Sequence, residues 1–179
     1  MTQLEAIKAR HSVRAYKEQA LAADAVEGLM EKVKSINDEV PGMHVQLVLN
    51  EPKAFASPMA RYGKVADAFS LNPGEKVVCV ISLGYGETQG SDHKRRTAAE
   101  VSNIESLGGD CPDWFKAGVE AALLAPTAVN QQKFMFEYKG DGKVSASRSF
   151  SMIGYTWTDL GIAKLHFEIA AGKHNFEWV

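Results

Sequence analysis

Apolar residues recur at helical spacing in four segments of the chain. A short first helix is expected to start at Thr2, because Thr2 and Glu5 have the spacing of a capping box, and to end between residues 10 and 12. Two longer helices are predicted from apolar residues every three or four positions. The residues of one are Val26, Leu29, Met30, Val33 and Ile36. Those of the other are Trp114, Phe115, Val119, Ala122 and Leu123, and Pro126 ends this second helix. A final helix at 159–171, capped by Gly172, is apolar nearly all round and is therefore predicted to lie in the core.

Alternating or continuous apolar residues predict strands in the intervening segments. Residues 44–49 place Val45, Leu47 and Leu49 on one face. Residues 77–81 are apolar on both faces, which is typical of a central strand covered on both sides, and Cys79 within them is predicted to be a buried core thiol. Residues 134–139 alternate, and the turn at 140–142 leads back into 143–147 as a hairpin.

These elements predict one α+β domain over residues 1–179, with a mainly antiparallel or mixed central sheet flanked by helices. Residues 13–16 are expected to be short and extended, residues 50–64 to form a loop, and residues 72–74 to form a turn. No sequence repeat and no linker between domains is evident.

Composition excludes several classes of function. The formal net charge is −2, from 20 basic and 22 acidic residues, so there is no general field for nucleic acid or an anionic membrane, and any anion site must be local. The two cysteines, Cys79 and Cys111, fit neither a disulfide framework nor a metal motif, which favours a reducing, cytoplasmic compartment. The N-terminus has no secretory signal pattern, and no apolar run reaches membrane-spanning length.

The segment Arg10-His11-Ser12-Val13-Arg14 is the first candidate binding site. Two guanidinium groups and a hydroxyl within five residues suit a phosphate, because arginine presents a fork of donors that matches phosphate oxygens. The alternative is a solvated helix cap.

A second candidate is the segment 125–132, which ends in Asn130-Gln131-Gln132. Each amide offers a donor and an acceptor and can bind the mixed edge of a planar heterocycle, although a turn with locally capped backbone groups is the plainer interpretation. Lys94-Arg95-Arg96 forms a basic loop after Gly84-Tyr85-Gly86, which lacks the third glycine of a dinucleotide fingerprint.

The remaining residues reveal neither a nucleophile elbow, a carboxylate pair nor histidines at metal-ligand spacing. His166 lies on the apolar final helix and is predicted to be a hydrogen-bonded core residue. Polar and cationic clusters without a nucleophile or metal are typical of proteins in which a bound cofactor supplies the chemistry.

Together these segments resemble the flavin-dependent nitroreductase family. Residues 4–16 are similar to its N-terminal signature, with His11 where a second arginine is usual. Residues 125–132 are similar to its Ala-Pro-Ser/Thr-x-x-Asn-x-Gln-Pro segment, with Lys133 in place of proline. Residues 80–86, with Lys94 and Arg96, resemble its late strand, Gly-Tyr pair and basic loop. The subgroup with a Pro-Thr-x-x-Asn-Gln-Gln motif is the nearest match.

The resemblance implies FMN bound between the subunits of a homodimer. It assigns Arg10, Ser12 and Arg14 to the phosphate and ribityl chain, with His11 contributing through its ring or backbone. Lys94 and Arg96 would close over the phosphate, and Asn130 and Gln132 would face the flavin ring. Reduced nicotinamide, NAD(P)H, would be the electron donor, and a nitroaromatic, quinone or similar small molecule the acceptor.

The chain departs from the family pattern near residues 64–65, where two family segments run directly together. Either the protein carries a natural or engineered deletion at this point, or the sequence omits a stretch that the protein has. We expect the omission, since a real loss of core helices would expose a large apolar surface. Two other classes stay open: a non-catalytic flavin-binding or sensor protein, and a structural α+β domain without a cofactor. Within the enzymes, a dehalogenase or flavin-destroying relative shares the scaffold.

Overall fold

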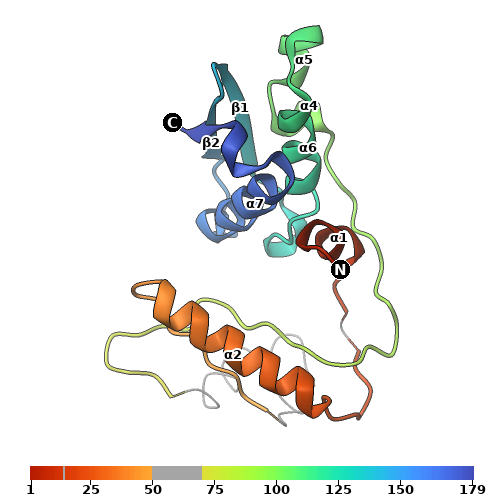
Figure 1. Cartoon of the computed structure of the whole chain (residues 1–179), viewed down its shortest axis with the longest axis vertical. Coiled ribbons are helices and arrows are strands. Elements are labelled where there is room, and N and C mark those ends of the chain that lie inside the picture. Colours follow the sequence, from red (N-terminus) through yellow and green to blue (C-terminus); the bar gives the residue numbers. More distant parts are fainter. Residues whose placement is uncertain (14, 50–69) are drawn as a thin grey trace. The chain divides into compact units, whose positions relative to one another are not determined.

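The computed structural model describes residues 1–13, 15–49 and 70–179, which form two compact units (Figure 1). The first unit contains residues 1–12 and 91–179, and the second contains residues 13–90. Arg14, the expected loop at 50–64 and the junction near 64–65 lie outside the described residues. Each unit is described by itself.

The first unit carries most of the regular structure. Its helices are α1 (Gln3–Ala9), α4 (Ala98–Val101), α5 (Ile104–Leu107), α6 (Asp113–Ala122) and α7 (Thr156–Ala171), and its strands are β1 (Phe134–Gly140), β2 (Lys143–Arg148) and β3 (Glu177–Trp178). Short 3-10 turns are η2 (Gly108–Asp110), η3 (Ala128–Asn130) and η4 (Lys173–Asn175). The predicted first, third and last helices are confirmed, with ends within a few residues of those expected.

Helix α1 begins with the predicted capping box. The backbone N–H of Glu5 donates to Thr2 Oγ1 at 3.2 Å, and the backbone N–H of Thr2 donates to Glu5 Oε2 at 2.8 Å. Both contacts satisfy amides that have no partner within a first helical turn. The helix ends at Ala9, and Arg10 is its extended C-cap.

The predicted hairpin is the centre of a three-stranded mixed sheet in the order β1-β2-β3. Strands β1 and β2 pair antiparallel from Phe134 opposite Arg148 to Gly140 opposite Lys143. Between them Asp141 and Gly142 both have positive φ, at 49° and 71°, which is the backbone that a tight two-residue hairpin requires. Strand β3, which the sequence did not predict, pairs parallel to β2.

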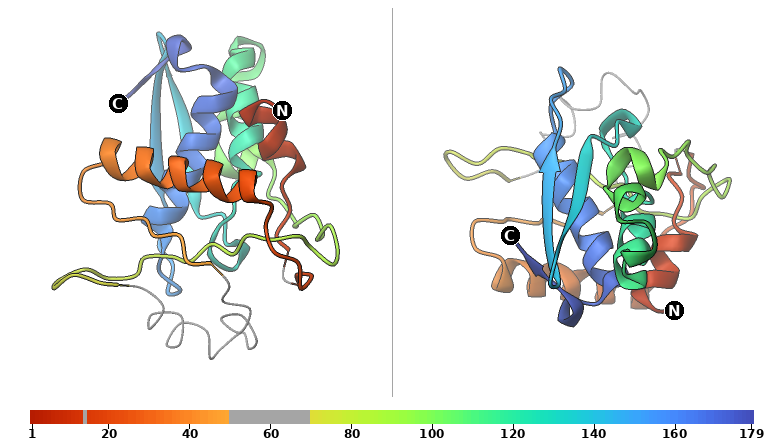
Figure 2. Two further views of the ribbon diagram at one scale, coloured as in Figure 1. Left: turned by 60° about the horizontal axis from the view of Figure 1, so that its bottom comes forward. Right: turned by 90° about the horizontal axis from the view of Figure 1, so that it is seen from above.

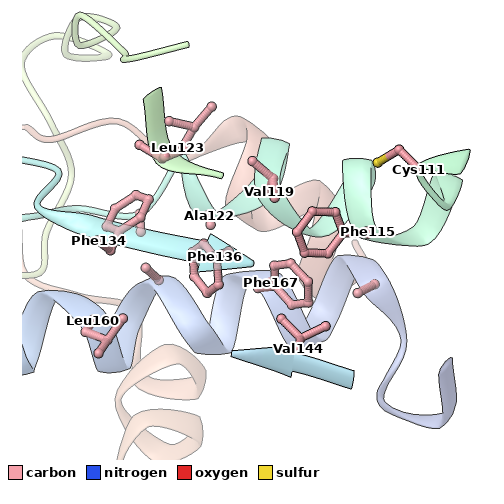
Figure 3. Close-up of a cluster of buried hydrophobic side chains, with 14 residues drawn as sticks. Cys111, Phe115, Val119, Ala122, Leu123, Phe134, Phe136, Val144, Leu160 and Phe167 are labelled. Carbon is pink, nitrogen blue, oxygen red and sulfur yellow. The ribbon is translucent and has the colours of Figure 1, made fainter. Parts of the chain in front are cut away.

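The core of this unit lies where α6, α7 and the hairpin meet. Helices α6 and α7 lie side by side, and α7 also packs on β1 and β2 (Figure 2). Figure 3 shows Phe115 of α6, Phe136 of β1 and Phe167 of α7 together, with the ring of Phe167 stacked on Phe136 at 5.0 Å between centroids. The predicted burial of the final helix is therefore confirmed, since Leu160, Ala163 and Phe167 belong to this cluster.

The second unit contains the predicted helix α2 (Ala23–Glu39) and two of the expected local features. The backbone N–H of Glu75 donates to Asn72 O at 3.0 Å and closes the turn at 72–74. Tyr16 is bridged antiparallel to Gly86, which confirms an extended chain on one side of Arg14. A Cβ on Gly86 would lie 2.5 Å from Thr88 O, so glycine is required at this close approach.

Two predicted strands are wrong. Residues 44–49 and 77–81 form no strand in the described part of the second unit. Near 45, side chains replace a strand ladder: Asn37 binds both the N–H and the C=O of Val45, at 2.7 and 3.0 Å, and Gln46 binds both backbone groups of Ser70.

The run at 77–81 is also not the covered central strand that its composition predicted. Val78 is 66% exposed and Ile81 is 77% exposed. Cys79, predicted to be a buried thiol, is exposed, whereas Cys111 is buried. Hydrophobicity indicates that a segment can be buried, but burial needs neighbouring strands and helices, and the described residues supply none here.

None of the helices that the structure describes has the length and the apolar composition needed to cross a membrane.

Candidate functional site

Arg10, the first predicted phosphate ligand, projects from the end of α1 toward the end of α6. Its Nη2 donates to Leu124 O at 3.2 Å, and its Nη1 lies 3.5 Å from Ser12 Oγ. His11 and Ser12 are exposed, and Arg14 lies outside the described residues. The structure therefore brings Arg10 and Ser12 together, and Arg10 Nε has no acceptor among the residues that the structure describes.

Three basic side chains bind carbonyl groups at the C-terminal end of α6. Besides Arg10 at Leu124 O, His93 Nε2 lies 3.1 Å from Leu123 O and His166 Nδ1 lies 3.1 Å from Ala121 O. The last carbonyls of a helix lack partners within it and carry its negative dipole end, so cationic and N–H donors are favourable there. The sequence offered a solvated cap near the end of the first helix as the alternative for Arg10; the observed partner is instead Leu124 O, just beyond the end of α6 and 114 positions away.

His166 is the hydrogen-bonded core residue that the sequence predicted. It is 8% exposed, and its ring donates to Ala121 O. Burial lowers the pKa of His166, and the charge of Arg10 lowers it further, against the opposing effect of the hydrogen bond to Ala121. A neutral imidazole follows, which suits a structural contact.

The amides of the second predicted segment bind the backbone of the basic loop. Gln132 accepts from the backbone N–H of Arg96 at 2.9 Å and donates to Lys94 O at 2.9 Å. Asn130 also donates to Lys94 O, at 2.8 Å, and accepts from Gln132 Nε2 at 2.9 Å. Four predicted site residues, Lys94, Arg96, Asn130 and Gln132, therefore form one cluster, although they lie up to 38 positions apart.

The turn that presents these amides has an unusual backbone. Val129, Asn130 and Gln132 have φ values of 44°, 57° and 45°, a region that non-glycine residues rarely adopt. Thr127 Oγ1 accepts from the backbone N–H of Gln132 at 3.1 Å and fixes one side of the turn. Such strained turns persist only where surrounding contacts hold them, and they concentrate at functional sites.

An open cavity of about 580 Å³ lies between α1, the basic loop and the end of α6. Three predicted site residues, Arg10, His11 and Arg96, line it, and so do other residues that the sequence analysis did not assign. The full lining is Leu4, Lys8, Arg10, His11, Asp92, His93, Arg95, Arg96, Ala117, Glu120, Ala121, Leu123, Leu124 and Ala170.

The charge of this cavity is predominantly positive. Arg95 is paired with Asp92, whereas Lys8, Arg10 and Arg96 form no salt bridge with any residue that the structure describes. The Nε atom of Arg10 is buried and has no hydrogen-bond partner among those residues. The chain as a whole carries a net charge of −2, so the positive charge of this cavity is local. A local cationic cluster is what the sequence analysis required of any anion site in this chain.

Sequence reasoning did not assign Lys8 or His93 to a site. Lys8 lies in the last turn of α1, two positions before Arg10, so its basic charge next to the first motif was a usable signal. His93 carried no comparable signal, because its partner Leu123 O is 30 positions away. No group of three or more metal-binding side chains occurs in the part of the chain covered by the structure.

Comparison with known proteins gives one family and one solved structure. The family model described as "Putative TM nitroreductase" matches residues 2–69 and 59–171, two segments that overlap and together span most of the chain. A crystal structure described as a putative nitroreductase from Thermotoga maritima shares the fold with a TM-score of 0.64 and 22% sequence identity, over 97% of this chain and 85% of that one. No curated protein matches the chain.

The structural match establishes a nitroreductase-like fold, in keeping with the α+β class expected from the sequence. The family match agrees with the resemblance carried by residues 4–16 and 125–132. The chain therefore belongs to the TM nitroreductase family.

Proposed function

We propose that the protein is an FMN-dependent oxidoreductase whose phosphate site is the cationic cavity beside Arg10. The family and the fold indicate an oxidoreductase of the nitroreductase type. The observation that carries the proposal is the convergence of Lys8, Arg10 and Arg96 on one cavity, where they form no salt bridge with any described residue, although Asp92 and Glu120 also line it. Guanidinium and ammonium groups of this kind bind phosphate through charge-assisted hydrogen bonds.

The donor set fits the phosphate of FMN. The buried Nε of Arg10 lacks an acceptor among the described residues, and a phosphate oxygen would provide one. His11 lines the same cavity, and Ser12 lies beside Arg10 Nη1. In this proposal Arg10 and Arg96 hold the phosphate, and His11, Ser12, Arg14 and the side chain of Lys94 complete its surroundings.

The amides have a different role in the proposal. The side chain of Gln132 is 2% exposed and is engaged with Lys94 O, Arg96 N and Asn130 Oδ1. We assign Gln132 to holding the basic loop in place, and Asn130, which is exposed, to the contact with the flavin ring. The two amides thus act at the same site, one through the loop and one directly.

Bound FMN would supply the redox chemistry, taking a hydride from NADH or NADPH and passing electrons to a nitroaromatic, a quinone or a similar acceptor. The residues of this chain would bind and orient the flavin and set its polar surroundings. We also propose a homodimer in the cytoplasm, in which the second subunit completes the flavin site, and sedimentation analysis of the flavin-loaded protein tests the dimer.

An absorbance spectrum of the purified protein, followed by anaerobic addition of reduced nicotinamide, tests the proposal. We expect a yellow protein that bleaches and regains its colour when a nitroaromatic compound is added. A bound flavin that never bleaches would instead identify a non-catalytic flavin-binding protein. A colourless preparation that gains no FMN on incubation would instead indicate a structural domain without a cofactor.

A further inference from the structure

Asp159 is a buried carboxylate that no motif of the site includes. It lies in the first turn of α7, is 4% exposed, and does not line the cationic cavity. Burying a carboxylate is costly unless hydrogen bonds compensate it, so its partners show what it does in the fold.

Both oxygens of Asp159 bind the turn at 128–131. Oδ1 accepts from the backbone N–H of Ala128 at 2.9 Å, and Oδ2 accepts from Gln131 Nε2 at 2.6 Å. Gln131 Nε2 also donates to Gly154 O at 2.9 Å. One carboxylate thus binds the first residue of η3 and the side chain of its C-cap residue, Gln131, on either side of the left-handed residues Val129 and Asn130.

A strained turn needs such contacts to keep its conformation. Residues held in the left-handed region are strained, and they persist where the surrounding structure over-determines them. Asp159 from α7 and Thr127 from within the segment are the side chains that bind its backbone N–H groups on the two sides. Without the carboxylate, the turn would have fewer contacts opposing its relaxation to ordinary φ values.

The 128–132 turn also positions the basic loop. The side chains of Asn130 and Gln132 donate to Lys94 O, and Gln132 accepts from the N–H of Arg96. Arg95 and Arg96 of this loop line the cavity. Hydrogen bonds therefore join Asp159 to one part of the turn and the next residues of the turn to the cationic loop.

We propose that Asp159 is a positioning residue for this anion site: it holds the 128–132 turn in the conformation that fixes Lys94 to Arg96 against the cavity. The inference rests on the proposed function only in taking the anion to be the FMN phosphate. The alternative is that Asp159 serves α7 alone, as an acidic residue near the positive end of the helix dipole.

The test compares Asp159→Asn with Leu160→Ala in the full-length protein. Leu160 is the next residue of α7, is 6% exposed and belongs to the core, so its truncation destabilises the fold, while its side chain carries no hydrogen bond to the turn. Hydrogen exchange is measured without ligand in peptides covering 93–98 and 126–133, and FMN affinity is measured by fluorescence titration.

For Asp159→Asn we expect exchange in both peptides to rise at least tenfold relative to β1 and the C-terminal half of α7, and FMN to bind at least tenfold more weakly. Leu160→Ala should lower the melting temperature while the FMN affinity stays within about twofold. Unchanged exchange at 93–98 in Asp159→Asn, or equal loss of FMN affinity in both variants, would overturn the proposal.

Two arms keep the result decisive. If Asp159→Asn does not fold, Gln131→Met removes the contacts of Nε2 to Asp159 Oδ2 and to Gly154 O but keeps the contact of Oδ1 to Ala128. It should raise exchange in the same two peptides by a smaller factor, and no rise there overturns the proposal. If the wild-type protein binds no FMN, the proposed function fails, while the exchange measurement still decides whether Asp159 holds the loop.

Discussion

Individual side chains at this site bind backbone groups far away in sequence. Gln132 binds the basic loop at Lys94 O and at the N–H of Arg96, and Arg10 binds Leu124 O just beyond the end of α6. These residues therefore have structural roles in addition to any contact with a ligand. Arg10 and Arg95 differ in the charge that they offer to an anion, because Arg95 is already paired with Asp92.

Substitution of Arg10 should weaken FMN binding far more than substitution of Arg95. A hydrogen bond to a charged group contributes about 1.5–3 kcal/mol, so we expect Arg10→Ala to raise the FMN Kd by roughly tenfold to a hundredfold. Arg95→Ala should raise it by less than about threefold, since that guanidinium is committed to Asp92. Flavin fluorescence titration measures both, with thermal melts to confirm folding. Equal and small effects would refute the assignment.

Gly118 of α6 packs closely against Phe167 of α7. A Cβ at this position would lie 2.6–2.9 Å from ring atoms of Phe167, which is fully buried. Overpacking of a core costs typically about 1–3 kcal/mol, so Gly118→Ala should destabilise the protein by that amount. The matched control is Gly161→Ala in α7, where nothing lies within 4 Å.

The control should be stabilising instead, by roughly 0.5–1 kcal/mol, since alanine restricts the unfolded chain more than glycine does. Urea unfolding measures both values. The same sign for the two substitutions would show that α6 and α7 do not meet at Gly118 as described.

Glu75 of the second unit predicts a local pH dependence. The backbone N–H and the side-chain amide of Asn72, together with His44, lower the pKa of Glu75 from 4.5 to about 2. A carboxyl with a depressed pKa contributes stability above its unfolded pKa, and this contribution is lost as the pH falls from about 4.5 toward 2.

An NMR titration of the Glu75 carboxyl carbon should give a midpoint near 2, and Asn72→Ala should move that midpoint upward. Asn72 Nδ2 lies 3.1 Å from Glu75 Oε1, so the substitution removes one of the named donors. A midpoint near 4.5 in the wild-type protein would contradict the contact.

At the scale of the element, β1 has backbone hydrogen bonds to a side chain on one edge and to strand β2 on the other. Asn103, the N-cap of α5, accepts from the backbone N–H of Tyr138 and donates to Tyr138 O, both at 3.0 Å. The amide thereby imitates a paired strand residue on the edge of β1 that faces away from β2, and α4 also packs against β1.

Removal of this amide should destabilise the hairpin. A buried or half-buried backbone group left without a partner costs about 1–3 kcal/mol, so Asn103→Ala should lower the free energy of unfolding by that order. Asn103→Asp keeps an acceptor for the Tyr138 N–H but loses the donor to Tyr138 O, and should fall between wild type and alanine. Urea denaturation tests this order, and an Asn103→Ala protein as stable as wild type would contradict it.

Several elements were predictable from local pattern alone. The capping box of α1, the apolar face of α6, the hairpin turn at Asp141-Gly142 and the all-round apolar α7 each depend on residues within a few positions of one another. The strands predicted at 44–49 and 77–81 failed because a strand requires partners from elsewhere in the chain, which the hydrophobic pattern does not specify. Strand β3 has two residues, too few for a period to be visible.

At the scale of the whole molecule, the two units differ in how they are held together. The first unit has a buried aromatic core built on Phe115, Phe136 and Phe167. In the second, no residue of α2 is buried, and the four apolar residues at helical spacing that face inward, Val26, Leu29, Val33 and Ile36, are half-buried. Burial of apolar surface is the main stabilising contribution to folding, so the units should differ in stability.

Denaturation followed by two probes should therefore give two transitions. All three tryptophans, Trp114, Trp157 and Trp178, lie in the first unit, so tryptophan fluorescence reports that unit. Far-UV circular dichroism also detects the 17-residue helix α2, and part of its signal should be lost at a lower urea concentration. Superimposable curves from the two probes would show that the units unfold together.

The sequence by itself determined the helices, the hairpin, the core position of His166 and the chemical types suited to a phosphate, because each follows from short-range spacing or from side-chain chemistry. Only the tertiary structure decided where those groups act. It joined Arg10 to Leu124 O, Gln132 to the loop at Lys94 and Arg96, and Asp159 to the turn at Ala128. These partners lie 31 to 114 positions apart, and packing of the helices and the sheet, rather than any local pattern, brings them within hydrogen-bonding distance.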